Sequence, residues 1–114
     1  MPYMMIMTNT GLSPHKRKDL LNDASRTVAD QLGKSENYVM VSYSHDADMV
    51  FAGTDDPMAY VELKSIGLPE DKTTSLSAAL CELMHQHLAI PGERVYIEFS
   101  AADRHMWGWN NKTF

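Results

Sequence analysis

The sequence lacks the features that mark membrane, nucleic-acid-binding and disulfide-stabilised proteins. Its single cysteine, Cys81, excludes a disulfide within the chain and a paired-thiol zinc or redox site. No apolar run approaches the ~20 residues of a membrane-spanning helix, and the apolar opening has neither the basic leader nor the cleavage region of a signal peptide. A formal net charge of −5, without a large cluster of lysine and arginine, argues against a nucleic-acid partner. These absences predict a cytoplasmic protein with no membrane and no nucleic-acid partner.

What the sequence does contain is enough apolar material for one packed domain over residues 1–114. Hydrophobic residues make up 44% of the chain and charged residues 22%, the balance of a globular domain rather than of a disordered segment. Four of the nine methionines lie in the first seven residues, and we interpret this cluster as packing. We predict no metal site, because thioether sites also need histidine or cysteine nearby and His85 and His87, two apart on a helix, point to different faces.

The first half of the chain has the pattern of a strand, a helix and a second strand. Residues 3–8 are continuously apolar before a final threonine, as in a strand covered on both faces. Ser13-Pro14 is typical of a helix start and Gly33 of a helix end, so we expect a helix of about 19 residues between them. Residues 38–43 are rich in β-forming side chains. A βαβ unit with parallel strands and a right-handed crossover is therefore predicted.

The second half repeats this order at a constant offset. Strands are expected over residues 58–63 and 94–99, with a helix between them whose apolar positions run from Leu76 to Leu88. An offset of 56 residues relates Gly11 to Gly67 and Val39 to Val95 without a gap. We interpret the chain as two pseudo-repeats, at about residues 2–50 and 57–105.

Two such units predict an α/β fold with a four-stranded mixed sheet and two helices on one face. The strands read as apolar on both sides, and a bare apolar sheet face is not stable in water. We therefore expect other copies of the chain to cover that face in a ring-like homo-oligomer. The aromatic tail over residues 105–114 would add an edge strand to a neighbour or line a cleft between subunits.

Proline in the second position is the first candidate for chemistry. An initiator methionine followed by a small residue is normally trimmed, which would leave Pro2 with a free secondary amine. The pKa of an α-amino group is about 8, and burial lowers it further because desolvation disfavours the charged form. A neutral amine at the mouth of an apolar pocket would serve as a general base. The alternative is that Pro2 merely begins an edge strand, where its missing N–H costs nothing.

Several short motifs lie along the whole chain in a fixed order and spacing. They are Pro2, Thr8-Asn9-Thr10, Gly33-Lys34, Ser65-Ile66-Gly67, Leu80-Cys81, Arg94-Val95-Tyr96-Ile97 and Gly108-Trp109-Asn110-Asn111-Lys112-Thr113-Phe114. Through them the chain resembles the macrophage migration inhibitory factor family of the tautomerase superfamily. The resemblance implies two βαβ repeats assembled as a homotrimer with active sites between subunits. It also implies an isomerase that tautomerises phenylpyruvate-type α-keto acids and dopachrome-type substrates without a cofactor.

The resemblance assigns three residues to the reacting part of the substrate. Pro2 would be the proton-transferring base, and Lys34 would pair with the substrate carboxylate. Ile66 would offer its backbone N–H to the same carboxylate. The alternative for Lys34 is an ordinary surface lysine after a helix cap.

Five further residues would form the walls of the pocket. Tyr96 would come from the neighbouring subunit and pack on the substrate ring, while Trp109 and Phe114 would keep the pocket dry. Interface packing is the alternative role for these aromatics, and the two roles are compatible. Two positions depart from the family pattern: Glu98 replaces an asparagine that bonds a ring hydroxyl, and Trp107 replaces a small aliphatic residue at the rim.

A cytokine-like, receptor-binding protein with weak or vestigial tautomerase activity is the alternative function. Some animal members of the family act in this way and are exported without a signal peptide. Of the arginine and aspartate that the resemblance links to receptor binding, Asp46 is present, but the arginine position is Leu12. The redox CxxC of animal members is also absent, with Met58 and Val61 at those positions.

Overall fold

Two βαβ units and a short C-terminal hairpin make up the fold. The computed structural model describes residues 1–114. The first unit consists of β1 (Tyr3–Thr8), α1 (Pro14–Leu32) and β2 (Met40–His45), and the second of β3 (Ala59–Ile66), α2 (Thr73–Leu88) and β4 (Val95–Ala102). The hairpin pairs β5 (Gly108–Trp109) with β6 (Lys112–Thr113).

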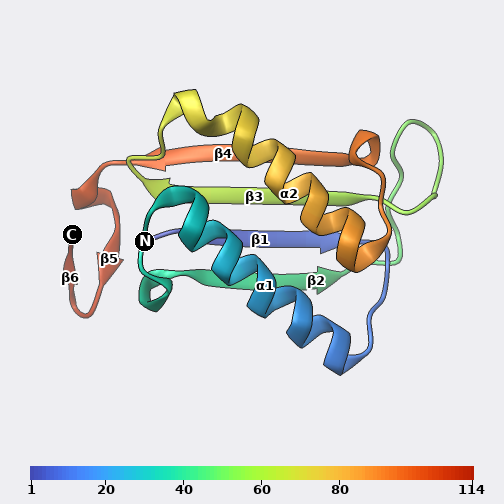
Figure 1. The fold of residues 1–114 in the computed structure, drawn as a ribbon, viewed down its shortest axis with the longest axis horizontal. Coiled ribbons are helices and arrows are strands. Elements are labelled where there is room, and N and C mark those ends of the chain that lie inside the picture. The colour runs from blue at the N-terminus through green and yellow to red at the C-terminus, as the bar shows by residue number, and fades with distance from the viewer.

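The four long strands form one mixed sheet in the order β2-β1-β3-β4. Strands β1 and β2 are parallel, as are β3 and β4, whereas the central pair β1 and β3 is antiparallel. Both helices cover the same face of this sheet (Figure 1). The predicted fold class is confirmed for the single chain.

Helix α1 begins and ends where the sequence predicts. The Ser13 hydroxyl accepts a hydrogen bond from the Lys16 N–H at 3.4 Å, and Pro14 occupies the first turn. Gly33 ends the helix with φ = 63°, a left-handed conformation in which a glycine carries no penalty. Both helices bury an apolar face against the sheet, with Leu20, Ala24, Val28 and Leu32 buried on α1 and Leu76, Leu80, Leu83, Met84 and Leu88 buried on α2.

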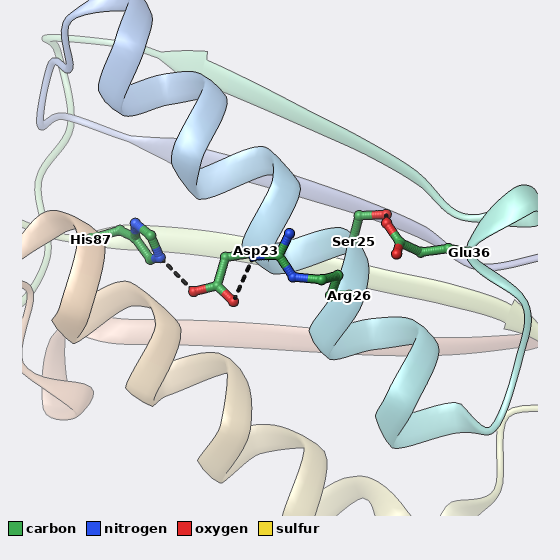
Figure 2. A network of polar contacts seen from close by, with 5 residues as sticks. All are labelled: Asp23, Ser25, Arg26, Glu36 and His87. Carbon is green, nitrogen blue, oxygen red and sulfur yellow. Dashed lines mark hydrogen bonds and ion pairs between the residues drawn. The ribbon is translucent and has the colours of Figure 1, made fainter.

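A histidine–aspartate contact joins the two helices. The ring nitrogen Nε2 of His87 on α2 lies 2.7 Å from Oδ2 of Asp23 on α1, and the other oxygen of Asp23 lies 4.0 Å from Arg26 (Figure 2). Nearby, the Ser25 hydroxyl donates to Glu36 at 2.8 Å and ties α1 to the turn that follows it. These contacts link the two helices to each other and α1 to residue Glu36.

The strand boundaries differ from those predicted, for two reasons. Strand β2 begins at Met40 rather than at residue 38, because residues Glu36–Tyr38 form a 3₁₀ turn, η1, whose start is capped by Ser35. Strands β3 and β4 continue three residues beyond their predicted ends because they pair in register as far as Ile66 and Ala102. Pairing between strands, which a single segment does not reveal, sets these limits.

The sheet face away from the helices is partly polar, which corrects the expectation that both faces are apolar. The Tyr60 hydroxyl donates to Glu98 at 2.8 Å and lies 3.1 Å from Glu62, whose carboxylate is 3.5 Å from the Lys64 ammonium. The hydrogen bond to Glu98, with desolvation and the second carboxylate, raises the pKa of Tyr60 to about 12. Apolar side chains dominate this face only along β1, where burial alternates instead of being continuous.

Neither helix has both the length and the apolar character that a membrane crossing requires.

Candidate active site

A cavity of about 380 Å³ lies where β1 begins, and most of its lining is apolar. This size is within the range of small-molecule sites. The N-terminus and the C-terminal hairpin lie at the same end of the sheet (Figure 1). Four segments contribute to the lining: residues 1–3, 37–40, 107–109 and Phe114. The tail lines this cavity within its own chain and pairs with itself as a hairpin, whereas its expected contact with a neighbouring subunit stays a prediction.

Three aromatic rings form one wall of the cavity. Trp109 and Phe114 stack with their ring centres 5.4 Å apart and their planes 13° apart. The Tyr38 ring meets both edge-on, at 5.6 Å from Trp109 and 6.3 Å from Phe114. Such geometries are the favoured ones for aromatic pairs. The three rings thus form one packed unit along this side of the cavity.

The C-terminal hairpin holds two of these rings in place. Asn110 and Asn111 join its strands with φ values of 53° and 63°, and asparagine tolerates this left-handed conformation better than most residues. The Phe114 N–H donates to the Trp107 carbonyl oxygen at 3.2 Å, so the end of the chain closes back on the hairpin. Trp107 itself lines the cavity.

Pro2 is buried at the base of the cavity, where the Met40 N–H donates to its carbonyl oxygen at 3.0 Å. In the full chain the terminal amine belongs to Met1. Burial, and then the charge of Lys34, lower the pKa of this amine from its ordinary value of 8.0. Loss of Met1 would transfer the amine to Pro2, one residue further into the same cavity.

Lys34 lies beside the cavity because it directly follows the Gly33 cap. Its N–H donates to the Ala29 carbonyl at 2.9 Å, which completes the end of α1. Its half-buried ammonium donates to the Ile66 carbonyl oxygen at 3.3 Å. This contact holds the ammonium near the chain terminus, and one hydrogen bond leaves it donors to spare for an anion.

Tyr96 and Glu98 lie outside this cavity. Tyr96 on β4 pairs with Tyr60 on β3, and Tyr60 pairs with Met7 on β1. Met7 lies five residues beyond Pro2 along the chain. At ~3.3 Å a residue this separates Tyr96 from Pro2 by about 17 Å along the sheet, with two strand spacings across it. Glu98 is hydrogen-bonded to Tyr60 on the open sheet face. A single chain therefore gathers Pro2 with Trp107, Trp109 and Phe114, places Lys34 and Ile66 beside them, and leaves Tyr96 and Glu98 apart.

Tyr38 is the main lining residue that sequence reasoning missed. Its β-forming neighbours led to a predicted strand, but Tyr38 ends the turn η1 and its ring packs on the C-terminal aromatics. The sequence does carry a signal for this turn, because Ser35 is a favoured N-cap residue and Glu36 is favoured in the first turn of a helix.

Comparison with known proteins gives consistent matches over the whole chain. The family model described as macrophage migration inhibitory factor (MIF) matches residues 1–114. A macrophage migration inhibitory factor homolog of Brugia malayi is 38% identical over 100% of this chain and 99% of its own length. The homolog of Trichuris trichiura is 36% identical over 100% of both chains.

Solved structures agree with the sequence matches. The crystal structure of a macrophage migration inhibitory factor homologue from Prochlorococcus marinus has a TM-score of 0.92 and 37% identity, with 98% of each chain covered. The structure of the Toxoplasma gondii protein of the same name has a TM-score of 0.90 and 33% identity over 98% of this chain and 99% of its own. The chain therefore belongs to the macrophage migration inhibitory factor family.

Proposed function

We propose that the chain, once Met1 is removed, is a cofactor-free keto–enol tautomerase for phenylpyruvate-type α-keto acids, with Pro2 as the general base. The observation that carries this proposal is that the terminal amine, held by Met1 in the full chain and next to Pro2, has a lowered pKa and lies in an aromatic cavity beside Lys34. A base must be neutral to accept a proton at pH 7, and burial with a nearby cation favours the neutral amine. Membership of the family, and through it of the tautomerase superfamily, supports the same reaction class.

The proposed reaction moves one proton within the substrate. The neutral Pro2 nitrogen removes a proton from the carbon between the ring and the keto group. The electrons of that C–H bond form the carbon–carbon double bond of the enol, and the ammonium proton passes to the carbonyl oxygen. Pro2 is then neutral again, so the step needs no oxidant, reductant or cofactor.

The residues around Pro2 have roles in binding. The Lys34 ammonium pairs with the substrate carboxylate, and the Ile66 backbone offers an N–H to the same group. The aromatic wall of Trp109 and Phe114 accepts the substrate ring, and Trp107 narrows the entrance. Holding the carboxylate and the ring at once brings the acidic carbon to the amine, which is how positioning lowers a barrier.

The proposed assembly is a homotrimer in which Tyr96 of one subunit completes the cavity of the next. The separation of about 17 Å along the sheet prevents Tyr96 from reaching the Pro2 of its own chain. Dopachrome-type compounds, which also carry a ring and a carboxyl group, fit the same arrangement as substrates.

The test compares phenylpyruvate tautomerisation by the mature protein, a Pro2→Gly variant and the same sequence with Met1 retained. Intact mass first establishes the state of Met1 in each preparation. We expect the mature protein to be active and both altered proteins to lose about 10²-fold or more, since positioned bases contribute that much. In the Met1-retaining form Pro2 is an amide nitrogen with no basicity. Equal rates in the three proteins would refute the proposed base.

A further inference from the structure

An arginine at the start of β4 fastens the loop between β2 and β3. The guanidinium of Arg94 donates to four backbone carbonyl oxygens of this loop, which spans residues 46–58. Its Nε lies 3.0 Å from the oxygen of Pro57, and one terminal nitrogen lies 3.1 Å from that of Phe51. The other terminal nitrogen lies 3.0 Å from the oxygen of Asp56 and 3.4 Å from that of Thr54. Arg94 therefore holds one side of a loop that contains no regular strand or helix, and Asn9 bonds the Asp55 oxygen at 2.9 Å and the Met58 N–H at 2.9 Å.

The same guanidinium contacts an aromatic pair formed by the half-buried Phe51 and the exposed Tyr96. It lies over the ring of Phe51, 5.3 Å from the ring centre, a favourable distance for a cation–π contact. The Phe51 ring lies 4.6 Å from that of Tyr96 at an angle of 44°. Contacts thus run from Arg94 through Phe51 to Tyr96.

Tyr96 is held on one side and free on the other. It is 66% exposed, whereas Arg94 and Phe51 are half-buried. An exposed side chain on a sheet normally exchanges between rotamers within nanoseconds. The Phe51 ring restricts this exchange on one side and leaves the other side of the Tyr96 ring open to a ligand or a second chain.

We propose that Arg94 is a positioning residue, which orients Tyr96 for an aromatic carboxylate bound in the cavity of the neighbouring subunit. The inference rests on the proposed function, in which Tyr96 packs on the substrate ring. A ring that is already oriented before the ligand arrives loses less conformational freedom on binding, so the ligand binds more tightly. Lysine cannot replace Arg94 in this role, because the contacts use the planar fork of the guanidinium.

The test measures the binding of hydrocinnamate, which has the ring and carboxylate of phenylpyruvate but no keto group, by titration calorimetry on the mature assembled protein. Arg94→Lys and Phe51→Leu should each weaken binding roughly three- to tenfold, because each releases Tyr96. Arg17→Lys is the matched control, because the Arg17 guanidinium also donates to a loop carbonyl oxygen, that of Leu12, at 3.1 Å. The Arg17→Lys variant should bind hydrocinnamate as tightly as the unmodified protein.

A double-mutant cycle separates positioning from general stability. If Arg94 acts through Tyr96, adding Arg94→Lys to Tyr96→Leu should weaken hydrocinnamate binding no further than Tyr96→Leu alone. The proposal would be overturned if the losses of hydrocinnamate affinity from Arg94→Lys and Tyr96→Leu add in the double mutant. It would also be overturned if Arg94→Lys and Phe51→Leu bind hydrocinnamate as the unmodified protein does, or if light scattering shows that either variant dissociates into monomers.

Turnover of phenylpyruvate is measured in an assay of its own, so that the proposed tautomerase function and the positioning role of Arg94 are tested independently. An unmodified mature protein that binds hydrocinnamate without tautomerising phenylpyruvate would refute the proposed function, and the cycle would still decide the role of Arg94. An unmodified protein that binds no hydrocinnamate would overturn the positioning role directly.

Discussion

The charge of the N-terminal nitrogen depends on two features of its surroundings. Burial removes water that would solvate the ammonium form, and the Lys34 ammonium repels a second positive charge. Both effects lower the pKa of the Met1 amine below 8.0, so this amine is mostly neutral at a lower pH than a fully solvated terminal amine would be. Loss of Met1 would leave the Pro2 amine in the same cavity, where we expect the same two causes to lower its pKa. Activity that depends on the neutral Pro2 amine should then rise as the pH increases through that pKa and be retained above it.

The pH profile of kcat/KM should therefore have an acidic limb whose midpoint reports the titration of the Pro2 amine. Lys34→Gln removes the repelling charge and should move this midpoint to higher pH. Lys112→Gln is the control, because Lys112 lies over the Trp109 ring at 5.7 Å and is not a cause of the shift. The measurement is the rate of phenylpyruvate tautomerisation at low substrate concentration across pH 5 to 9. A midpoint that is unchanged or lowered in Lys34→Gln would contradict this explanation.

Individual site residues differed in how well the sequence predicted them. The chemistry of an N-terminal amine suggested Pro2, and the aromatic content of residues 105–114 suggested that the tail is not solvated, whereas the wall roles of Trp109 and Phe114 came from the family resemblance. The position of Lys34 follows from Gly33, whose place as a helix cap the sequence indicates. Tyr38 was missed because its packing depends on the C-terminal hairpin, which is distant in sequence.

At the scale of the elements, the two helices end in the same way with different residues. Gly33 ends α1 with φ = 63° and ψ = 37°, and Ala89, at the equivalent place in the second unit, ends α2 with φ = 56° and ψ = 34°. A residue with a Cβ pays a steric cost in this region that glycine does not. The second unit is therefore strained at a position where the first is not.

Ala89→Gly should raise the free energy of unfolding by roughly 0.5–1 kcal/mol, and Gly33→Ala should lower it by a similar amount. The space around the Gly33 Cβ position is open, so the expected loss comes from backbone conformation and not from a clash. For a chain of this size the change corresponds to about 2–4 °C in Tm. Thermal unfolding at one protein concentration would measure both, and shifts of the same sign in the two variants would contradict the prediction.

The contact between His87 and Asp23 gives a second prediction for the helices (Figure 2). Both side chains are partly shielded, with 20% and 34% of their surface exposed, and the separation of 2.7 Å is that of a good hydrogen bond. Its loss in His87→Ala should cost about 1 kcal/mol, or about 4 °C in Tm. His85→Ala is the matched control, because His85 is exposed in the last turns of the same helix. Equal effects of the two substitutions would show that the interhelical contact contributes nothing.

The elements themselves show what sequence patterns can and cannot predict. Helix α1 was predicted to the residue because its limits are local signals, namely Ser13-Pro14 and Gly33. The ends of β3 and β4 were wrong because they depend on pairing with each other. The polar open face of β3 was missed for a related reason: Tyr60 and Glu62 look unremarkable alone, and only their alignment with Glu98 on β4 makes a network.

At the scale of the whole molecule, two apolar hollows lie at opposite ends of the sheet. The first is the cavity around Pro2. The second, of about 450 Å³, is lined by residues 49–52, 58–60 and Tyr96, all of them apolar or aromatic. Different surfaces at opposite ends of a subunit suit head-to-tail contact, which closes into a ring when the rotation between subunits allows it. This arrangement would cover both hollows and bring Tyr96 to a neighbour's Pro2.

A mixture of two defective chains tests whether each active site is shared between subunits. Pro2→Gly replaces the secondary amine of proline by the primary amine of a flexible glycine, and Tyr96→Leu lacks the ring, so each alone should have low kcat/KM. In a trimer that contains both, the Tyr96→Leu chain supplies Pro2 and its Pro2→Gly neighbour supplies Tyr96. Three quarters of randomly mixed trimers then hold one intact site of three, so co-refolding equal amounts should restore about a quarter of the unmodified activity.

The control for this experiment is simple mixing of the two folded proteins, which should restore little until subunits exchange. The size of the assembly is measured in parallel, with about three times the chain mass of 12.9 kDa expected. A site built within one chain would give no recovery at any ratio, because every chain in the mixture would lack either Pro2 or Tyr96. Recovery of activity would therefore support a site shared between subunits, as we propose because Tyr96 lies too far along the sheet to reach the Pro2 of its own chain.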